Sequence, residues 1–156
     1  MSHKIAILRG INVGGKRKVL MSDLKALCKE LDWKNVRTYI QSGNIIFNSN
    51  KKHTELETSL EKIIKDKYDF EVPVIVRSSE DLQLLINKNP YDNENTDIKQ
   101  LHLTFLKVQP TKENIKHLLT YNFEPDKFEI WNKEVFIFCK GKYHKSKVSN
   151  GFIEKN

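Results

Sequence analysis

The order of strand-like and helix-like segments in residues 1–78 limits the fold more than any other feature. Segment 4–10 (KIAILRG) is apolar and rich in β-formers, and segments 35–41 and 43–48 have a similar character on either side of Ser42-Gly43. Two such runs around a short polar turn predict a β-hairpin, and the earlier run predicts a strand. The run VIVR after Pro73 predicts a fourth strand.

Two segments between these strands carry apolar residues at helical spacing. The apolar positions are Leu24, Leu27, Cys28 and Leu31 in the first segment and Leu56, Leu60, Ile63 and Ile64 in the second. Ser22 is placed to cap the first helix, and Thr54 with Glu57 has the capping-box spacing for the second. The predicted order is therefore β-α-β-β-α-β, which is that of the ferredoxin-like unit.

The second part of the chain repeats most of this order. The expected elements are a linking helix over 78–87, a polar loop over 89–97, a strand over 100–108, a helix over 111–121, a hairpin of 127–131 with 134–139, and the start of a helix at 146–156. Ile115, Leu118 and Leu119 are expected to face inward from the helix over 111–121. The repeat lacks its final strand.

These elements predict an α+β protein built from two ferredoxin-like (βαββα) halves packed together. The predicted divisions are an N-terminal half over 1–77, a linking helix and loop over 78–99, and a C-terminal half over 100–156. We expect the two sheets to lie in contact or side by side, with helices on their outer faces, because apolar residues on both sides of a strand require two covered faces. Tyr39 and Phe47 could stack on bases, but they are expected instead to pack between the halves.

The topology brings two polar, glycine-containing segments together. A helix that crosses back between the first two strands makes those strands run in the same direction. The loop after the first strand, RGINVGGKRK (9–18), and the turn QSGN (41–44) are therefore expected at the same end of the sheet.

These two segments contain the groups of an anion-binding site. The candidate ligand-binding residues are Arg9, Gly10, Asn12, Gly14, Gly15, Lys16, Gln41, Ser42, Gly43 and Asn44. Glycines permit positive φ and close approach of a ligand to main-chain amides, and an arginine offers a planar fork to a carboxylate or phosphate. The complete Walker pattern G-x-x-x-x-G-K-[ST] does not occur, because Arg17 stands at its last position, and the dinucleotide-binding pattern G-x-G-x-x-G does not occur either. The alternative is a flexible connection with a turn glycine at Gly43, and composition alone leaves both open.

Charge and cysteine content limit the protein class. Lysine and arginine number 27 against 20 acidic residues, a formal charge of +7. Most of these cations are lysines scattered along the chain, which is typical of a solvated surface and does not by itself indicate nucleic-acid binding. No apolar run is long enough for a membrane span or a signal peptide. Cys28 and Cys139 have no paired spacing and sit in apolar surroundings, so we expect buried free thiols and a cytoplasmic protein.

Patterns that indicate catalysis are few. The five histidines have no metal-ligand spacing, so no metal site is expected. Ser42 has no base nearby in sequence and is interpreted as a turn residue, and Ser146, near His144, is interpreted as a helix N-cap. No two carboxylates are paired for acid–base chemistry. Whether the protein is an enzyme and which cofactor it uses are left open.

Five segments carry a resemblance to a known family: RGINVGGK, DLKALCKELDW, TYIQSGN, VPVIVRS and a late SKVSN. With these segments the chain resembles the bacterial family called domain of unknown function 1697. The resemblance covers essentially the whole chain. It implies a two-part α/β fold with ferredoxin-like halves, a bacterial cytoplasmic origin and no established activity. Family members continue after SKVSN with a segment like TTRNWNT, so the resemblance also implies that this chain is truncated at its C-terminus.

The sequence therefore predicts a protein that binds a small anionic or nucleotide-like ligand at the glycine-rich loop and the QSGN turn. An RNA-binding module is the second choice, because ferredoxin-like sheets bind RNA when aromatic residues on exposed strands stack on bases, and these strands lack an alternating basic and aromatic pattern. An undiscovered enzyme that uses the same site is a further alternative. The oligomeric state is not predicted.

Overall fold

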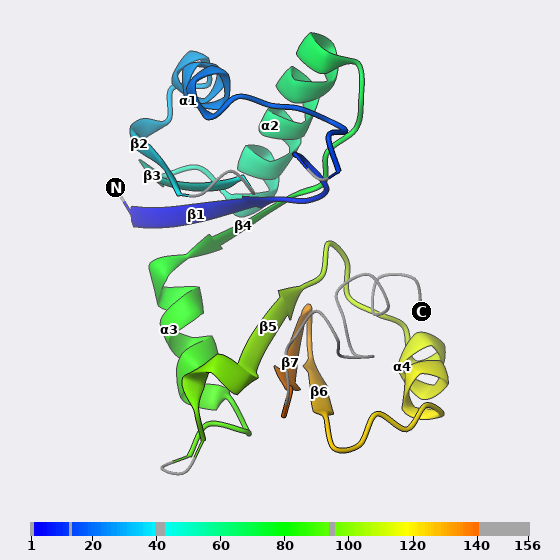
Figure 1. The fold of residues 1–156 in the computed structure, drawn as a ribbon. Helices are drawn as coiled ribbons and strands as arrows, with labels where there is room; N and C mark the ends of the chain where they lie inside the picture. Colours follow the sequence, from blue (N-terminus) through cyan, green and yellow to red (C-terminus); the bar gives the residue numbers. More distant parts are fainter. Residues whose placement is uncertain (1, 13, 40–42, 94–95, 141–156) are drawn as a thin grey trace. The chain divides into compact units, whose positions relative to one another are not determined.

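The protein is a mixed α+β structure with two antiparallel sheets (Figure 1). The computed structural model describes residues 2–12, 14–39, 43–93 and 96–140. The chain divides into two compact units, Met1–Ile86 and Asn87–Asn156, called the first and the second unit below. The predicted α+β class is confirmed.

The first unit contains the predicted strands and helices in the predicted order. They are β1 (Ser2–Leu8), α1 (Met21–Glu30), β2 (Lys34–Tyr39), β3 (Asn44–Ser49), α2 (His53–Tyr68) and β4 (Val74–Ser78). Helix α3 (Ser79–Lys88) follows β4 directly and continues into the second unit.

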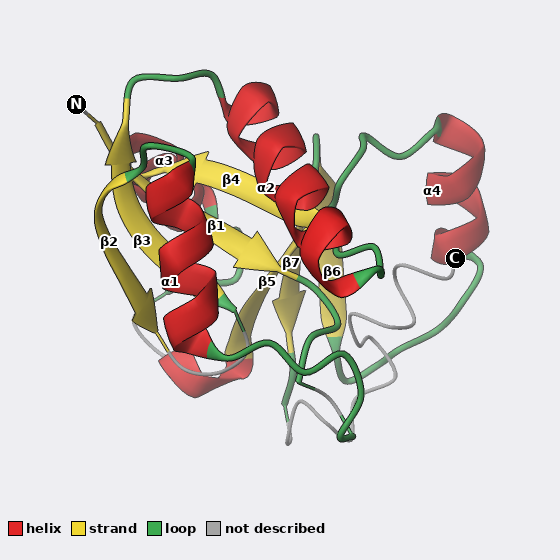
Figure 2. Ribbon diagram, turned by 90° about the horizontal axis from the view of Figure 1, so that it is seen from above, coloured by secondary structure: helices red, strands yellow, loops and turns green. Residues whose placement is uncertain are grey.

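The sheet of the first unit has the strand order β2-β3-β1-β4. Strand β1 is antiparallel to both of its neighbours, with Ile5 opposite Ile46 on β3 and Ala6 opposite Val76 on β4. Because β2 is antiparallel to β3 as well, β1 and β2 run in the same direction, as the sequence predicts. Helices α1 and α2 lie on the same side of this sheet (Figure 2).

The core of the first unit lies between the sheet and these two helices. Ala6 and Leu8 alternate along β1 with less buried residues, and both face this core. The ring of Phe47 stacks on Trp33 with centroids 3.9 Å apart. The prediction that Phe47 packs between the halves is therefore wrong, because its ring is fully buried in the core of the first unit. Side chains alternate between the two faces along β3, and this alternation turns Phe47 toward the helices.

The predicted helix caps are also corrected. Helix α1 begins two residues earlier than predicted, with Leu20 in the N-cap position, so Ser22 is not its cap. At the start of α2 the Lys52 amide donates to the Glu55 carboxylate at 3.1 Å. Glu57, the predicted capping residue, instead accepts a hydrogen bond from the Val76 amide on β4 at 3.3 Å. Glu57 thus links helix to sheet, a partnership between residues distant in sequence.

The second unit is smaller, and its described residues form one antiparallel sheet, one 3-10 helix and one α-helix after α3. Its elements are the 3-10 helix η1 (Ile98–Gln100), β5 (Leu101–Phe105), α4 (Lys112–Leu119), β6 (Lys127–Trp131) and β7 (Glu134–Phe138). The strand order is β5-β7-β6. The hairpin of β6 and β7 turns at Asn132, which has φ 54°, and confirms the predicted turn.

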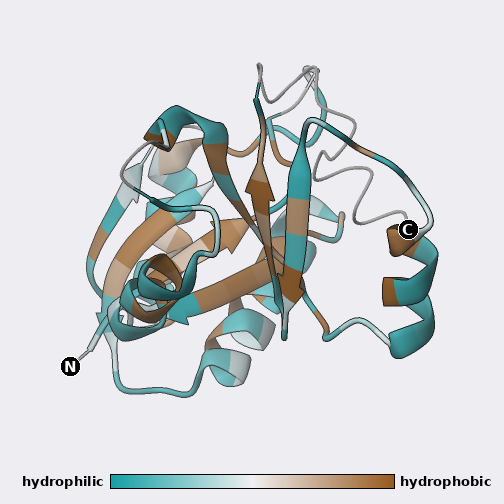
Figure 3. Ribbon diagram, turned by 90° about the horizontal axis from the view of Figure 1, so that it is seen from below, coloured by the Kyte–Doolittle hydropathy of each residue, from teal (hydrophilic) through white to brown (hydrophobic). Residues whose placement is uncertain are grey.

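One face of the second sheet packs against α4 and the segment after it. Val135 and Ile137 on β7 are fully buried there, with Leu118 and Phe123 packed over them. Figure 3 shows the corresponding alternation of hydrophobic and hydrophilic residues along α4. Leu119, predicted to face inward, is 63% exposed, because α4 ends at this residue and its inward stripe is carried by Leu118.

Both cysteines are free and buried, as predicted. The predicted helix over 146–156, its proposed cap Ser146 and the nearby His144 lie outside the described residues. Of the helices in the described ranges, none combines the length and the apolar character needed to cross a lipid bilayer.

Candidate functional site

The loop that joins β1 to α1, residues 9–20, starts at the end of the sheet where β2 and β3 are also connected. The Leu8 amide donates a hydrogen bond to the Gly43 carbonyl at 3.0 Å. The predicted approach of the glycine-rich loop to the turn after β2 is therefore confirmed at Gly43. The other predicted residues of that turn, Gln41 and Ser42, lie outside the described residues.

Gly43 is packed tightly against the start of this loop. Its φ is 89°, and a Cβ added there would lie 2.7 Å from Ile11 Cδ1 and 2.9 Å from Leu8 Cβ. Ile11 itself is 2% exposed and belongs to the hydrophobic core. Both the backbone conformation and the close approach of Ile11 therefore require glycine at position 43.

The side chain of Asn12 closes the base of the loop. Its Nδ2 donates to the Val19 carbonyl at 3.0 Å, and its Oδ1 accepts from the Val19 amide at 2.9 Å. The backbone amide of Asn12 also donates to the Arg17 carbonyl at 3.1 Å. Asn12 was predicted as a ligand-binding residue, but both polar atoms of its side chain bind the loop itself. Its role in the structure is to fix the loop base.

The tip of the loop is exposed and contains its glycines and basic residues. Gly10, Gly14 and Gly15 all have positive φ, of 71°, 59° and 72°. No atom lies within 4 Å of a Cβ built on Gly14 or Gly15. The three basic side chains of residues 16–18 are exposed. The closed base therefore presents a short cationic tip with open space around its two central glycines.

Arg17 differs from its lysine neighbours because it binds the protein itself. Its Nη1 donates to the Glu71 carbonyl at 2.9 Å, and its guanidinium lies 5.7 Å from the centre of the Phe70 ring. Phe70 packs against the core that α1 and α2 cover. The tip is therefore held on the helix side of the sheet.

Arg9 lies on the opposite side of the sheet. Its amide donates to the Pro73 carbonyl at 3.1 Å, which extends the pairing of β1 with β4 by one residue. Because side chains alternate along a strand and Leu8 faces the core, Arg9 and Ile7 face away from the helices. Asn44 is the cross-strand partner of Ile7 and shares this face. Arg9 and Asn44, two of the predicted residues, are thus brought to one face, and the lysines of the tip are not.

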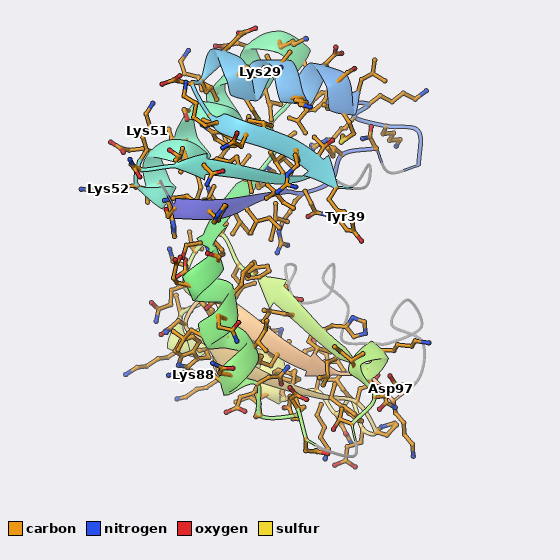
Figure 4. The ribbon with its side chains drawn as sticks, turned by 90° about the vertical axis from the view of Figure 1, so that its left-hand side faces the viewer. Lys29, Tyr39, Lys51, Lys52, Lys88 and Asp97 are labelled. Atoms are coloured by element: carbon orange, nitrogen blue, oxygen red, sulfur yellow. The ribbon has the colours of Figure 1, made fainter. Side chains whose placement is uncertain are left out.

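Sequence reasoning missed Tyr39 as a candidate for this site. Tyr39 ends β2, pairs with Asn44 and therefore lies on the same face as Asn44 and Arg9. It is 63% exposed, although the sequence predicts it as a packing residue. The signal available in the sequence was its position: it is the last strand residue before the turn, in alternation with buried Val36 on the other face. Figure 4 labels it at the end of the first sheet opposite to Lys51 and Lys52.

Nucleophilic and metal chemistry receive no support from the described residues. Burial raises the pKa of the Cys28 thiol to about 12, so the reactive thiolate is not formed at neutral pH. Within the described ranges, no group of three or more histidine, cysteine, aspartate or glutamate side chains could hold a metal ion.

A second group of charged residues lies at the other end of the first sheet. His53 Nδ1 is 3.7 Å from Asp81 Oδ2, which joins the starts of α2 and α3. Burial lowers the pKa of His53, and the positive charge of Lys4 lowers it further, while the Asp81 carboxylate acts in the opposite direction. The Lys4 ammonium, also within this group, donates to the Lys51 carbonyl at 2.8 Å. These contacts hold helices to the sheet.

The second unit contains a shallow depression of about 520 Å³. Its lining residues are Gln100, Glu124, Pro125, Lys127, Phe138 and Lys140. Charges of both signs line it, and Lys140 donates its amide to the Asp126 carboxylate at 2.9 Å. Its polar groups do not converge on one type of ligand, so the loop end of the first sheet remains the candidate site.

Comparisons with known proteins agree with this architecture. One solved structure, that of a conserved bacterial protein from Streptococcus pneumoniae, has a TM-score of 0.78 over 93% of this chain and 82% of that chain. The two sequences are 24% identical, so the likeness concerns the fold alone. A search of curated proteins finds no match. The family model described as a protein of unknown function (DUF1697) matches residues 1–136, and the chain therefore belongs to that family.

Proposed function

We propose that the first unit binds a small anionic ligand at the end of its sheet where the β1–α1 loop meets Gly43. The observation that carries the proposal is the construction of the loop. Asn12 and Ile11 fix its base, while Lys16 and Lys18 stay exposed beside two glycines with positive φ. A loop that only connected two elements would need neither a closed base nor a cationic tip.

The groups at this end supply three kinds of contact with an anion. Positive charge comes from Lys16 at the tip of the loop and from Arg9 on the other face of this sheet end, and charge-assisted hydrogen bonds to such groups contribute roughly 1.5–3 kcal/mol each. The amides around Gly14 and Gly15 can approach a ligand closely because no side chain shields them. Gln41 and Asn44 orient the ligand, since each amide side chain offers a donor and an acceptor.

The fold of each unit supports a ferredoxin-like assignment, which is part of this proposal. In the first unit, the order β2-β3-β1-β4 with both crossover helices on one face is that expected of a split β-α-β arrangement. In the second unit, β7 lies between β5 and β6, with α4 connecting those two outer strands. The same β-α-β-β repeat therefore describes both units: β1-α1-β2-β3 in the first and β5-α4-β6-β7 in the second, each with its last strand between the other two.

RNA binding is the second candidate. Its support is the sheet face that α1 and α2 leave uncovered, which carries Arg37 and Tyr39 on the edge strand β2. The central positions of that face are Ile5, Ile7 and Ile46, where stacking on bases would require aromatic rings. The small-ligand proposal is therefore preferred.

A thermal-shift screen of nucleotides, phosphosugars and short RNAs tests the proposal. The test variant is Lys16→Ala/Lys18→Ala, which removes the exposed charges of the tip. The matched control is Lys51→Ala/Lys52→Ala, which removes the same charge from two exposed lysines at the other end of the same sheet (Figure 4). A small-ligand shift that the test variant loses and the control keeps supports the proposal.

Two other results of the same screen would reject it. A shift by RNA alone that falls steeply with salt and is weakened equally by both double variants indicates diffuse phosphate contacts, which is the RNA alternative. A small-ligand shift that both double variants retain places the binding site elsewhere.

A further inference from the structure

The sheet end described above includes an exposed aromatic residue that anion binding does not use. Tyr39 is 63% exposed at the end of β2. An exposed tyrosine offers a large flat surface with only two side-chain torsions to fix, so it binds planar groups at little entropic cost. Inorganic phosphate or a phosphosugar has no planar group to place there.

The register of the sheet puts Tyr39 in line with the polar residues of the same face. Tyr39 is paired with Asn44, and Asn44 with Ile7. Neighbouring strands are about 4.8 Å apart, so Tyr39 and Ile7 are separated by about 10 Å across the sheet. Arg9 follows Ile7 on the same face of β1, with its amide bound to Pro73. Tyr39, Asn44 and Arg9 therefore lie on one face, with Arg9 two residues along the chain from the position directly across the sheet from Tyr39.

We propose that the ligand is a nucleoside phosphate whose base stacks on Tyr39 and whose phosphate is held at Arg9. This inference rests on the proposed function and names the ligand class for it. The spacing matches the two ends of a single nucleotide, with the base and the phosphate on opposite sides of the sugar. Asn44 lies between them and can donate to and accept from the base edge or the ribose.

The assignment predicts that recognition of the base is separable from recognition of the phosphate. Stacking on an aromatic side chain is tolerant of base identity because every base has a π-face. Adenosine and uridine 5′-monophosphates should therefore both bind roughly ten-fold more tightly than ribose 5-phosphate, a difference typical of one stacked base. Inorganic phosphate should bind more weakly than any of the three.

Calorimetric titration of the full chain with these four compounds tests the inference. Tyr39→Ala should reduce nucleotide affinity to that of ribose 5-phosphate, whereas Tyr39→Phe, which keeps the ring, should retain the preference. Tyr121→Ala removes another exposed tyrosine, one in the second unit, and is the matched control. In proton spectra, the adenine ring protons should shift upfield on binding, and Tyr39→Ala should abolish that shift.

The possible failures are distinguishable. If ribose 5-phosphate binds as tightly as the nucleotides, and Lys16→Ala/Lys18→Ala weakens all of them, the anion site stands and the nucleotide inference is overturned. If Tyr39→Ala keeps the nucleotide preference, the base is bound elsewhere and the inference is also overturned. If none of the four compounds binds, the proposed function itself fails. The fold of each variant is verified by its unfolding transition.

Discussion

At the scale of single residues, the site depends on two positions that hold the loop rather than on those that would touch a ligand. Ile11 inserts into the core beside Gly43, and Asn12 binds both backbone groups of Val19. A loop with several residues at positive φ is costly to order, and these two contacts offset that cost. The exposed lysines can then differ in sequence without altering the loop base.

Gly43→Ala should destabilise the protein more than Gly14→Ala. Both glycines have positive φ, of 89° and 59°, so both substitutions introduce backbone strain of about 1 kcal/mol. Only at Gly43 does the new Cβ collide with Ile11, at 2.7 Å, which adds the cost of overpacking, about 1–3 kcal/mol. Urea unfolding of the two variants measures the difference. Equal losses would show that Ile11 moves aside freely.

At the scale of elements, the first unit is held together by contacts between helix starts and strands. The Glu57 carboxylate of α2 accepts from the Val76 amide of β4, and His53 at the start of α2 lies beside Asp81 of α3. Ser78 and Asp81 exchange hydrogen bonds at the start of α3, from the Ser78 amide to the Asp81 carboxylate and from the Asp81 amide to the Ser78 hydroxyl. This end of the sheet is therefore held by contacts between its own helices and strands, whereas the proposed binding site lies at the loop end.

The stability of the first unit should fall on acidification in a way that depends on His53. Burial and the charge of Lys4 lower the pKa of His53 in the folded protein, so the unfolded chain binds a proton more readily. The contribution of neutral His53 to the free energy of unfolding is therefore fully present above the ordinary pKa of about 6.5. It is lost as pH falls through the lower pKa that His53 has in the folded protein. His53→Gln should flatten this part of the pH profile.

Urea unfolding from about pH 5 to 8, with imidazole titration by NMR, checks this expectation. His102→Gln is the control, because the pKa of His102 is also lowered by burial but His102 lies in the second unit. Asp81→Asn removes an opposing negative charge and should lower the His53 pKa further. A His53 pKa above its ordinary value would contradict the argument.

At the scale of the whole molecule, the described chain has two separate hydrophobic cores, each with one buried free cysteine. Cys28 belongs to the core of the first unit and Cys139 to the core of the second. A buried thiol reacts only when its surroundings open, so each cysteine reports on its own unit.

Core substitutions should therefore change the labelling rates of the two cysteines selectively. Phe47→Ala removes a ring stacked on Trp33, costs about 3–5 kcal/mol and should accelerate labelling of Cys28. Leu118→Ala in α4 should accelerate labelling of Cys139 instead. Mass spectrometry of thiol labelling under native conditions assigns the rates. Equal acceleration of both cysteines by either variant would show that the two units unfold as one.

The sequence by itself determined the elements of this protein and their order. Alternation along strands and helical spacing of Leu24, Leu27 and Cys28 are local patterns, and each burial pattern repeats within a few residues. The element order also predicted that the glycine-rich loop approaches the turn at Gly43, because a crossover helix makes β1 and β2 run the same way. The glycines with positive φ in the loop, Gly10, Gly14 and Gly15, were likewise visible in the sequence, whereas the positive φ of Asn12 and Arg17 was not.

Only the tertiary structure decided where the polar groups of the loop end lie and what some of them bind. Asn12 has the same chemistry as Asn44, yet Asn12 binds the Val19 backbone while Asn44 lies on the sheet face beside Tyr39. The hydrogen bond between Glu57 and the Val76 amide could likewise not be predicted from the sequence, since the two residues lie 19 positions apart. Hydrogen-bonding capacity belongs to a residue type, but the partner that satisfies it is set by the distance and direction that the folded backbone imposes.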